Sequence, residues 1–124
     1  MRFLTSLGAG ACLAMSLPSL AFADCHFSPY EFFPDRNDRV TIDVTADAGS
    51  SCAMGFREGP GYRFTSATWA KAPPHGILSQ TGPTAFVYRA FDNYRGPDSY
   101  ALKICAVVNG KSGCSILIYN VELH

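Results

Sequence analysis

The sequence predicts an all-β domain, an antiparallel β-sandwich of about seven strands preceded by a cleaved signal peptide. Short runs of alternating apolar and polar residues recur along the chain, and turns rich in Gly and Pro separate them. Beyond the N-terminal segment, no window longer than ten residues keeps a helical period. Several short strands at regular spacing are typical of a sandwich.

The N-terminal segment, residues 1–23, has the form of a secretory signal peptide. Arg2 gives a positive start, an uncharged apolar run follows, and an A-x-A cleavage site ends at Ala23. A membrane anchor is the alternative, but Gly and Pro dilute the run and the cleavage site follows at once. A lipoprotein is a further alternative, although the residues before Cys12 and Cys25 make poor lipid-attachment boxes. We therefore expect a periplasmic or extracellular protein with no membrane span after cleavage.

The exported chain, residues 24–124, is long enough for one domain. Without Arg2, nine Lys and Arg residues stand against ten Asp and Glu residues. This near-neutral balance provides no attraction to nucleic acid or to an anionic membrane surface. We predict no nucleic-acid partner and no cofactor.

Four cysteines remain in the exported chain, and an even number in a small exported domain predicts two disulfides. Asn109-Gly110 lies between two β runs and is a strong hairpin signal. If these residues form a two-residue turn, Cys105 faces Cys114 at a non-hydrogen-bonded pair, where side chains approach closely. We therefore prefer Cys105–Cys114 and Cys25–Cys52 among the three possible pairings. A metal site is the alternative, but no C-x-x-C spacing occurs.

The first half of the exported chain predicts an irregular segment followed by three strands. Residues 24–38 are broken by prolines and contain His26, Phe27, Tyr30, Phe32 and Phe33. We expect these rings to lie over the edge of the core, because aromatic side chains mainly supply buried area; an exposed recognition strip is the alternative. Apolar and polar residues alternate most regularly in the run 40–47, so its sheet is expected to have one solvent-exposed face. Strands are expected at 52–56 and 62–71, with Trp69 in the core.

The second half predicts four strands, at 75–78, 84–91, 98–108 and 112–123. Pro73 and Pro74 separate the first of these from the strand before it, since neither can donate to a ladder. The Asn109-Gly110 register also aligns the inward residues of the last two strands. These are Tyr100 with Tyr119 and Leu102 with Leu117.

The stretch from Pro74 to Tyr100 carries a recurring pattern. It contains Pro74-His75-Gly76-Ile77-Leu78, a strand ending at Tyr88, and Tyr94-x-Gly96-x-Asp98-x-Tyr100. With the final strand, this pattern resembles bacterial Ig-like and cadherin-like domains over about residues 64–123. Those domains are β-sandwich modules often found in tandem in secreted adhesins. Ala90 stands where the family usually has proline, and this chain is a single module with two disulfides.

The resemblance implies an Ig-like fold and a role in adhesion or binding, and it supplies no catalytic residue. The residues also have physical roles of their own. Gly96 permits a turn that a side chain would crowd. Asp98 can accept hydrogen bonds from loop N–H groups, and Tyr100 is expected to point inward.

No catalytic motif is present: the chain lacks G-x-S-x-G, H-E-x-x-H and a P-loop. We therefore predict no enzyme and no catalytic residue. Candidate metal ligands are His26 with His75, and, for Ca²⁺, the acids Asp43, Asp47, Asp92 and Asp98. Because these are scattered, no metal site is predicted.

Surface recognition is the remaining function to consider. Tyr94-Arg95 and Tyr62-Arg63 each place an aromatic ring beside an arginine in or next to a loop, and both residue types are enriched in binding hot spots. The alternative is that they are ordinary loop residues. The first hypothesis is a non-enzymatic domain that binds a protein or cell-envelope partner through loops at one end. A protein is favoured over a sugar because Trp69 is expected in the core. The second hypothesis is an accessory domain that assembles through sheet edges.

Overall fold

The computed structural model describes residues 25–124, so the predicted signal peptide, its cleavage site and Cys12 lie outside the described residues. The elements are β1 (His26–Phe27), the 3-10 helix η2 (Pro34–Arg36), β2 (Arg39–Ala46), β3 (Ser51–Gly55), β4 (Tyr62–Lys71), β5 (Gly76–Gly82), β6 (Ala85–Ala90), β7 (Gly96–Val108) and β8 (Lys111–Leu123). Within residues 25–124, no helix is long and apolar enough to cross a membrane.

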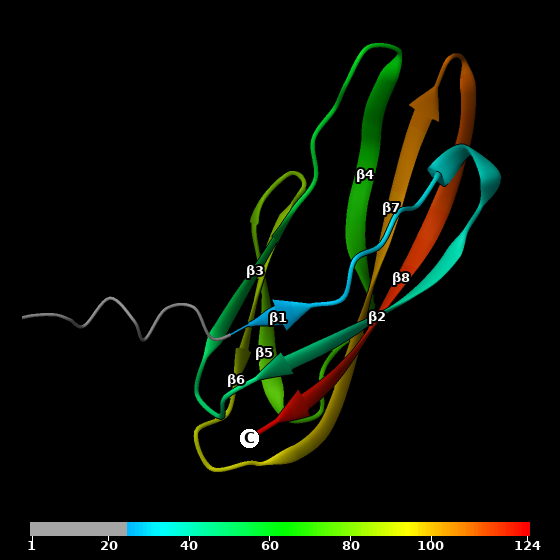
Figure 1. The fold of residues 1–124 in the computed structure, drawn as a ribbon. Helices are drawn as coiled ribbons and strands as arrows, with labels where there is room; N and C mark the ends of the chain where they lie inside the picture. The colour runs from blue at the N-terminus through cyan, green and yellow to red at the C-terminus, as the bar shows by residue number, and fades with distance from the viewer. Residues whose placement is uncertain (1–24) are drawn as a thin grey trace, which may run out of the picture.

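The strands form two sheets that face each other (Figure 1). The larger has the order β1-β2-β8-β7-β4 and the smaller the order β3-β6-β5. An all-β sandwich is therefore confirmed, with the two-residue β1 added to the predicted strands.

The prediction that all pairing is antiparallel was wrong, because β2 runs parallel to β8 over its whole length. The reason lies in η2, which packs against β7 and β8 near their hairpin. The chain leaves η2 beside the start of β8, where the Ile116 N–H donates to the Asp38 carbonyl oxygen. β2 then begins at the same end as β8 and runs in the same direction.

The hairpin of β7 and β8 has the predicted register. Asn109 and Gly110 have φ angles of 51° and 82°, as a type I′ turn requires. Cys105 lies opposite Cys114, with their Cα atoms 4.0 Å apart, and the two form a disulfide. The predicted pairing of the cysteines is confirmed.

The centre of the core is a stack of three tyrosine rings contributed by both sheets. Tyr100 lies between Tyr88 and Tyr119, with 4.7 Å between ring centroids on each side. All three side chains are fully buried. The predicted inward direction of Tyr100 is confirmed, and stacked rings of this size supply much of the apolar area that holds the sheets together.

Trp69 was expected in the core, and this prediction was wrong: its side chain is 49% exposed. Trp69 lies opposite the buried Leu102, but β4 is the outermost strand of the large sheet. A residue at a sheet edge has covering neighbours on one side only, so its position on the inward face does not bury it.

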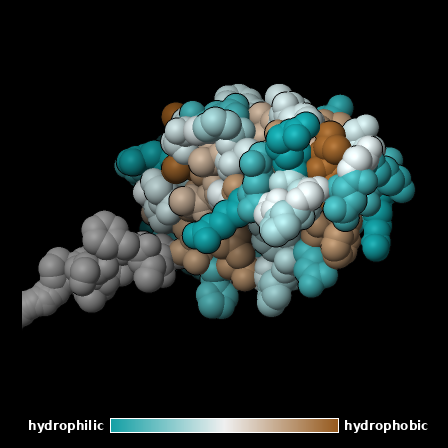
Figure 2. Space-filling view, turned by 90° about the horizontal axis from the view of Figure 1, so that it is seen from above, coloured by the Kyte–Doolittle hydropathy of each residue, from teal (hydrophilic) through white to brown (hydrophobic). Residues whose placement is uncertain are grey.

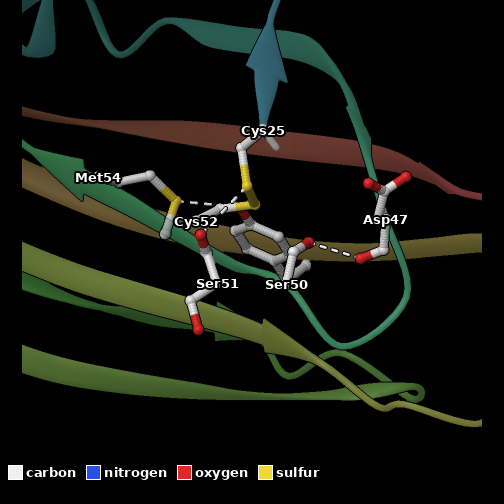
Figure 3. Close-up of a disulfide and its surroundings, with 7 residues drawn as sticks. Cys25, Asp47, Ser50, Ser51, Cys52 and Met54 are labelled. Atoms are coloured by element: carbon white, nitrogen blue, oxygen red, sulfur yellow. Dashed lines mark hydrogen bonds between the residues drawn. A yellow bond between two sulfur atoms is a disulfide. The ribbon is translucent and has the colours of Figure 1, made fainter. Parts of the chain in front are cut away.

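The N-terminal segment covers one side of the core, as expected. Cys25 is bonded to Cys52 of β3, which ties the segment to the small sheet (Figure 3). Phe27 and Tyr30 each present an edge to the ring of Tyr119, at centroid distances of 6.2 and 6.5 Å. Because its sulfur is in a disulfide, Cys25 is not available as a lipid-attachment site.

Candidate functional site

The four residues predicted to bind a partner do not form one site. Tyr62 and Arg63 pair with Val108 and Val107 at the end of β7, whereas Tyr94 and Arg95 directly precede its start. A strand of 13 residues spans about 40 Å. The two Tyr-Arg pairs therefore lie at opposite ends of the sandwich.

At one end, Tyr94 is part of the framework of the loop. Its ring stacks on the ring of His75, with centroids 3.5 Å apart and planes 2° from parallel. Its hydroxyl donates to the Pro97 carbonyl oxygen at 2.7 Å, across a turn in which Gly96 has a φ of 124°. Tyr94 thus holds the corner that leads into β7, while Arg95 remains exposed.

Behind this corner lies the buried carboxylate of Asp98. It accepts hydrogen bonds from the His75 backbone N–H at 3.2 Å and from the Tyr88 hydroxyl at 2.7 Å. The expectation that Asp98 accepts from a loop N–H is therefore confirmed. Burial and this carboxylate raise the pKa of Tyr88.

The outer face of the large sheet carries a hollow of about 550 Å³ beside the same corner. Asp43, Asn120 and Ser99 lie side by side in register across three strands. The Lys71 ammonium donates to the Ser99 hydroxyl oxygen. Among residues 25–124, no group of three or more His, Cys, Asp or Glu side chains could hold a metal ion.

The other end, where β4 begins, contains an aromatic groove of about 440 Å³. We define the aromatic groove by its lining rings and its two charged residues: Tyr30, Phe32, Phe33, Phe56, Tyr62, Phe64, Glu31 and Arg57. Figure 2 views the molecule from this end and shows apolar residues, coloured tan to brown, in the open between polar ones. The volume lies in the range of small ligand sites.

The rings of the groove contact one another in sequence. Phe32 meets Phe56 edge-on at 5.5 Å, Phe56 meets Phe64 at 6.3 Å, and Phe64 meets Tyr62 at 5.2 Å. Two chain segments therefore make the walls, the N-terminal segment on one side and the β3–β4 connection with β4 on the other. Phe33 is 40% exposed at the rim.

The charges at this end are arranged around the rings. Burial and the charge of Asp35 raise the pKa of Tyr62. The guanidinium of Arg36 lies over the Phe33 ring, 4.6 Å from its centroid. Glu58 accepts from the Phe64 backbone N–H at 3.0 Å, so this carboxylate is committed to the wall itself.

Sequence reasoning identified Tyr62 but missed most of the groove. Arg63 follows Tyr62 and so stands on the opposite face of β4; the arginine that lines the groove is Arg57. Phe32 was recognised as part of an aromatic segment, which was expected to cover the core edge, with an exposed recognition strip as the alternative. The segment covers the core edge and also forms a wall, and the signal for the second role was the number of its rings.

No protein family and no curated protein matches the chain. Similar solved structures include an endo-fucoidan hydrolase of glycoside hydrolase family 107, at a TM-score of 0.37 and 13% identity, covering 89% of this chain and 16% of the hydrolase. They also include a cysteine protease inhibitor from Entamoeba histolytica, at a TM-score of 0.26 and 12% identity, covering 73% of this chain and 90% of the inhibitor. Similarity at this level carries no argument about function.

Proposed function

We propose that this chain is an exported, non-enzymatic, Ig-like domain that binds a protein or cell-envelope partner through the aromatic groove. The two disulfides support a non-reducing compartment, periplasmic or extracellular. The resemblance to bacterial Ig-like and cadherin-like domains agrees with a binding role.

The aromatic groove is the observation that carries the proposal. Tyr30 packs on Tyr119 of the core, and Phe32, Phe56 and Phe64 also pack against the core, so these rings need little ordering when a partner binds. Aromatic side chains with a neighbouring arginine are enriched where binding energy concentrates. Phe33 and Arg57 are exposed at the groove and are the residues available to a partner first.

Affinity capture tests the proposal, with the disulfide-bonded protein as bait and light crosslinking in an envelope extract of the source cells. The variant is Phe33→Ala with Arg57→Ala. The matched control is Phe91→Ala with Arg95→Ala, because Phe91 is also 40% exposed and this Phe-Arg pair lies at the opposite end. We expect the partner to be lost with the first variant and retained with the second. Retention with the first variant contradicts the proposal.

A second candidate is an accessory domain that assembles through sheet edges. One observation favours it: β3 is the outermost strand of the small sheet, and its ladder with β6 is unbroken. In the capture experiment, recovery of the protein itself as the crosslinked species supports this candidate.

A further inference from the structure

The two sheets have four outer strands, and three of them are poor templates for a further strand. β1 has two residues. The ladder of β4 is shifted twice, and the Gln80 amide of the neighbouring sheet donates to the Ala67 carbonyl oxygen. The ladder of β5 is shifted near its end. Bulges and shortness are common protections of exposed sheet edges.

β3 has none of these protections. It pairs with β6 through five consecutive residues without a register shift. Its sequence, Ser-Cys-Ala-Met-Gly, contains no charge and no proline. Its outward residues Ala53 and Gly55 are exposed, and a Cβ placed on Gly55 would meet no atom within 4 Å. β3 is therefore a regular strand, and nothing covers its outward side chains at Ala53 and Gly55.

The free backbone groups of β3 can be assigned from the bonds at its two ends. The Ala90 N–H donates to the Ser50 carbonyl oxygen, and the Phe56 N–H donates to the Thr84 carbonyl oxygen. Alternate residues of an antiparallel strand bond to the same neighbour, so the N–H and C=O groups of Ala53 and Gly55 point away from β6.

The beginning of the edge is covered. The sulfur of Cys25 lies 3.3 Å from the Ser51 carbonyl oxygen, so another strand cannot bond there. The end of the edge is different, because Gly55, Phe56 and Arg57 continue directly into the lining of the aromatic groove. A strand that runs along Ala53 and Gly55 leads into this groove.

We propose that β3 is a strand-addition site: an extended peptide segment of a partner protein pairs with Ala53 and Gly55, and one large apolar side chain of it enters the aromatic groove. This inference rests on the proposed function and names the class of partner. Main-chain hydrogen bonds supply affinity in such complexes, and a pocket for one side chain supplies selectivity. Both Glu31 and Arg57 line the groove, so its charge selects neither sign next to the apolar anchor.

A second copy of the chain fits this site less well. An antiparallel pair of β3 edges centred on Met54 would place Ala53 of each copy opposite Gly55 of the other. Beyond Gly55, Ser51 of the second copy would lie opposite Arg57, beside the aromatic groove. Ser51 has no large apolar side chain, so a second copy would leave the groove empty, whereas a peptide of a partner protein can fill it.

The test begins with a library of random linear peptides displayed on phage, selected on the disulfide-bonded protein. Enriched peptides are then synthesised, and their binding is measured with amide hydrogen exchange. We expect slower exchange at Ala53 and Gly55 on binding. Ala53→Pro removes an N–H that does not bond to β6, and we expect at least about tenfold weaker binding. Ala53→Thr keeps the N–H, so its affinity should fall less than that of Ala53→Pro.

Each other result decides against the strand-addition site. No enriched peptide, or equal affinity for wild type and Ala53→Pro with no protection at the edge, overturns it. The exchange measurement on wild type does so even if the proline variant does not fold. Binding that is lost in Phe33→Ala/Arg57→Ala but kept in Ala53→Pro overturns strand addition and leaves the proposed function standing. A concentration-dependent dimer that Ala53→Pro abolishes assigns the edge to a second copy and overturns the peptide.

Discussion

The Tyr88 hydroxyl donates a 2.7 Å hydrogen bond to the carboxylate of Asp98, and this bond joins the two sheets inside the core. Tyr88 comes from β6 of the small sheet and Asp98 from β7 of the large one. Both side chains are buried. The bond therefore links the tyrosine stack to the loop corner that His75 and Tyr94 form above it.

Removing this donor is expected to destabilise the fold. In Tyr88→Phe the carboxylate of Asp98 retains only the His75 N–H, and a buried charge that loses a hydrogen bond costs about 1.5–3 kcal/mol. Denaturant unfolding measures the loss. The double variant Tyr88→Phe/Asp98→Asn is the control, because an uncharged amide needs the donor less. Its loss of unfolding free energy should be smaller than the sum of the losses in the two single variants. Additive losses would show that the two groups do not stabilise each other.

Alkaline pH is expected to destabilise the protein through the tyrosine stack. Burial raises the pKa of Tyr88, Tyr100 and Tyr119 above the ordinary value, so the folded protein holds these protons more tightly than the unfolded chain. Their contribution is fully present below the unfolded pKa of about 10 and is lost as the pH rises above it. Each of the three tyrosines adds a slope of about 1.4 kcal/mol per pH unit.

The measurement is the free energy of unfolding from neutral pH to about pH 11, with tyrosinate absorbance as a second signal. Tyr119→Phe removes one of the three titrating groups and should reduce the slope by about one third. A flat profile above pH 10, or tyrosinate absorbance before unfolding that exceeds what the three tyrosines outside the stack can supply, would show that the stack ionises in the folded protein.

Much of the local structure could be predicted because local chemistry determines it. A two-residue turn at Asn109-Gly110 sets the partner of every residue in the hairpin, so one dipeptide yields both the register and the Cys105–Cys114 disulfide. Alternation along β2 identifies its buried face, since successive side chains point to opposite sides.

The features that the sequence did not predict depend on contacts between distant segments. The exposure of Trp69 follows from the position of β4 at the edge of its sheet, and the residues of a strand do not determine its place in the strand order. The parallel pairing of β2 follows from the docking of η2 on the last hairpin. The separation of Tyr62 from Tyr94 by the length of β7 is a third case. The aromatic groove also needs this information, because Phe32 and Phe56 meet only in the folded chain.

Two glycines of the small sheet offer a matched comparison. A Cβ at Gly76 would lie 2.6 Å from Cε1 of Tyr88 and 2.7 Å from the Arg89 carbonyl oxygen. Tyr88 is fixed in the stack and the carbonyl is backbone, so Gly76→Ala is expected to destabilise by about 1–3 kcal/mol. At Gly55 the space is open, and Gly55→Ala should stay within about 0.5 kcal/mol of wild type. Thermal unfolding of both variants checks this, and equal effects would mean that β5 moves away from β6.

The two disulfides are expected to differ in stability and in their effect on binding. Cys25–Cys52 spans 27 residues of sequence and Cys105–Cys114 spans 9. Loop-closure entropy gives about 3.5 kcal/mol for the first and about 2.5 kcal/mol for the second. Replacing each pair by alanines, followed by denaturant unfolding, measures the difference.

The two disulfides are expected to differ more in their effect on partner binding than in their effect on stability. Cys25–Cys52 ties down the N-terminal segment, and this segment carries Phe32 and Phe33 into one wall of the aromatic groove. Cys105–Cys114 closes a hairpin that the ladder of β7 and β8 already holds in register. At a temperature where both variants are folded, partner capture should therefore fall only when Cys25 and Cys52 are replaced. Unchanged capture after replacement of Cys25 and Cys52 would mean that binding does not depend on the tethered segment, and the interface would have to lie elsewhere.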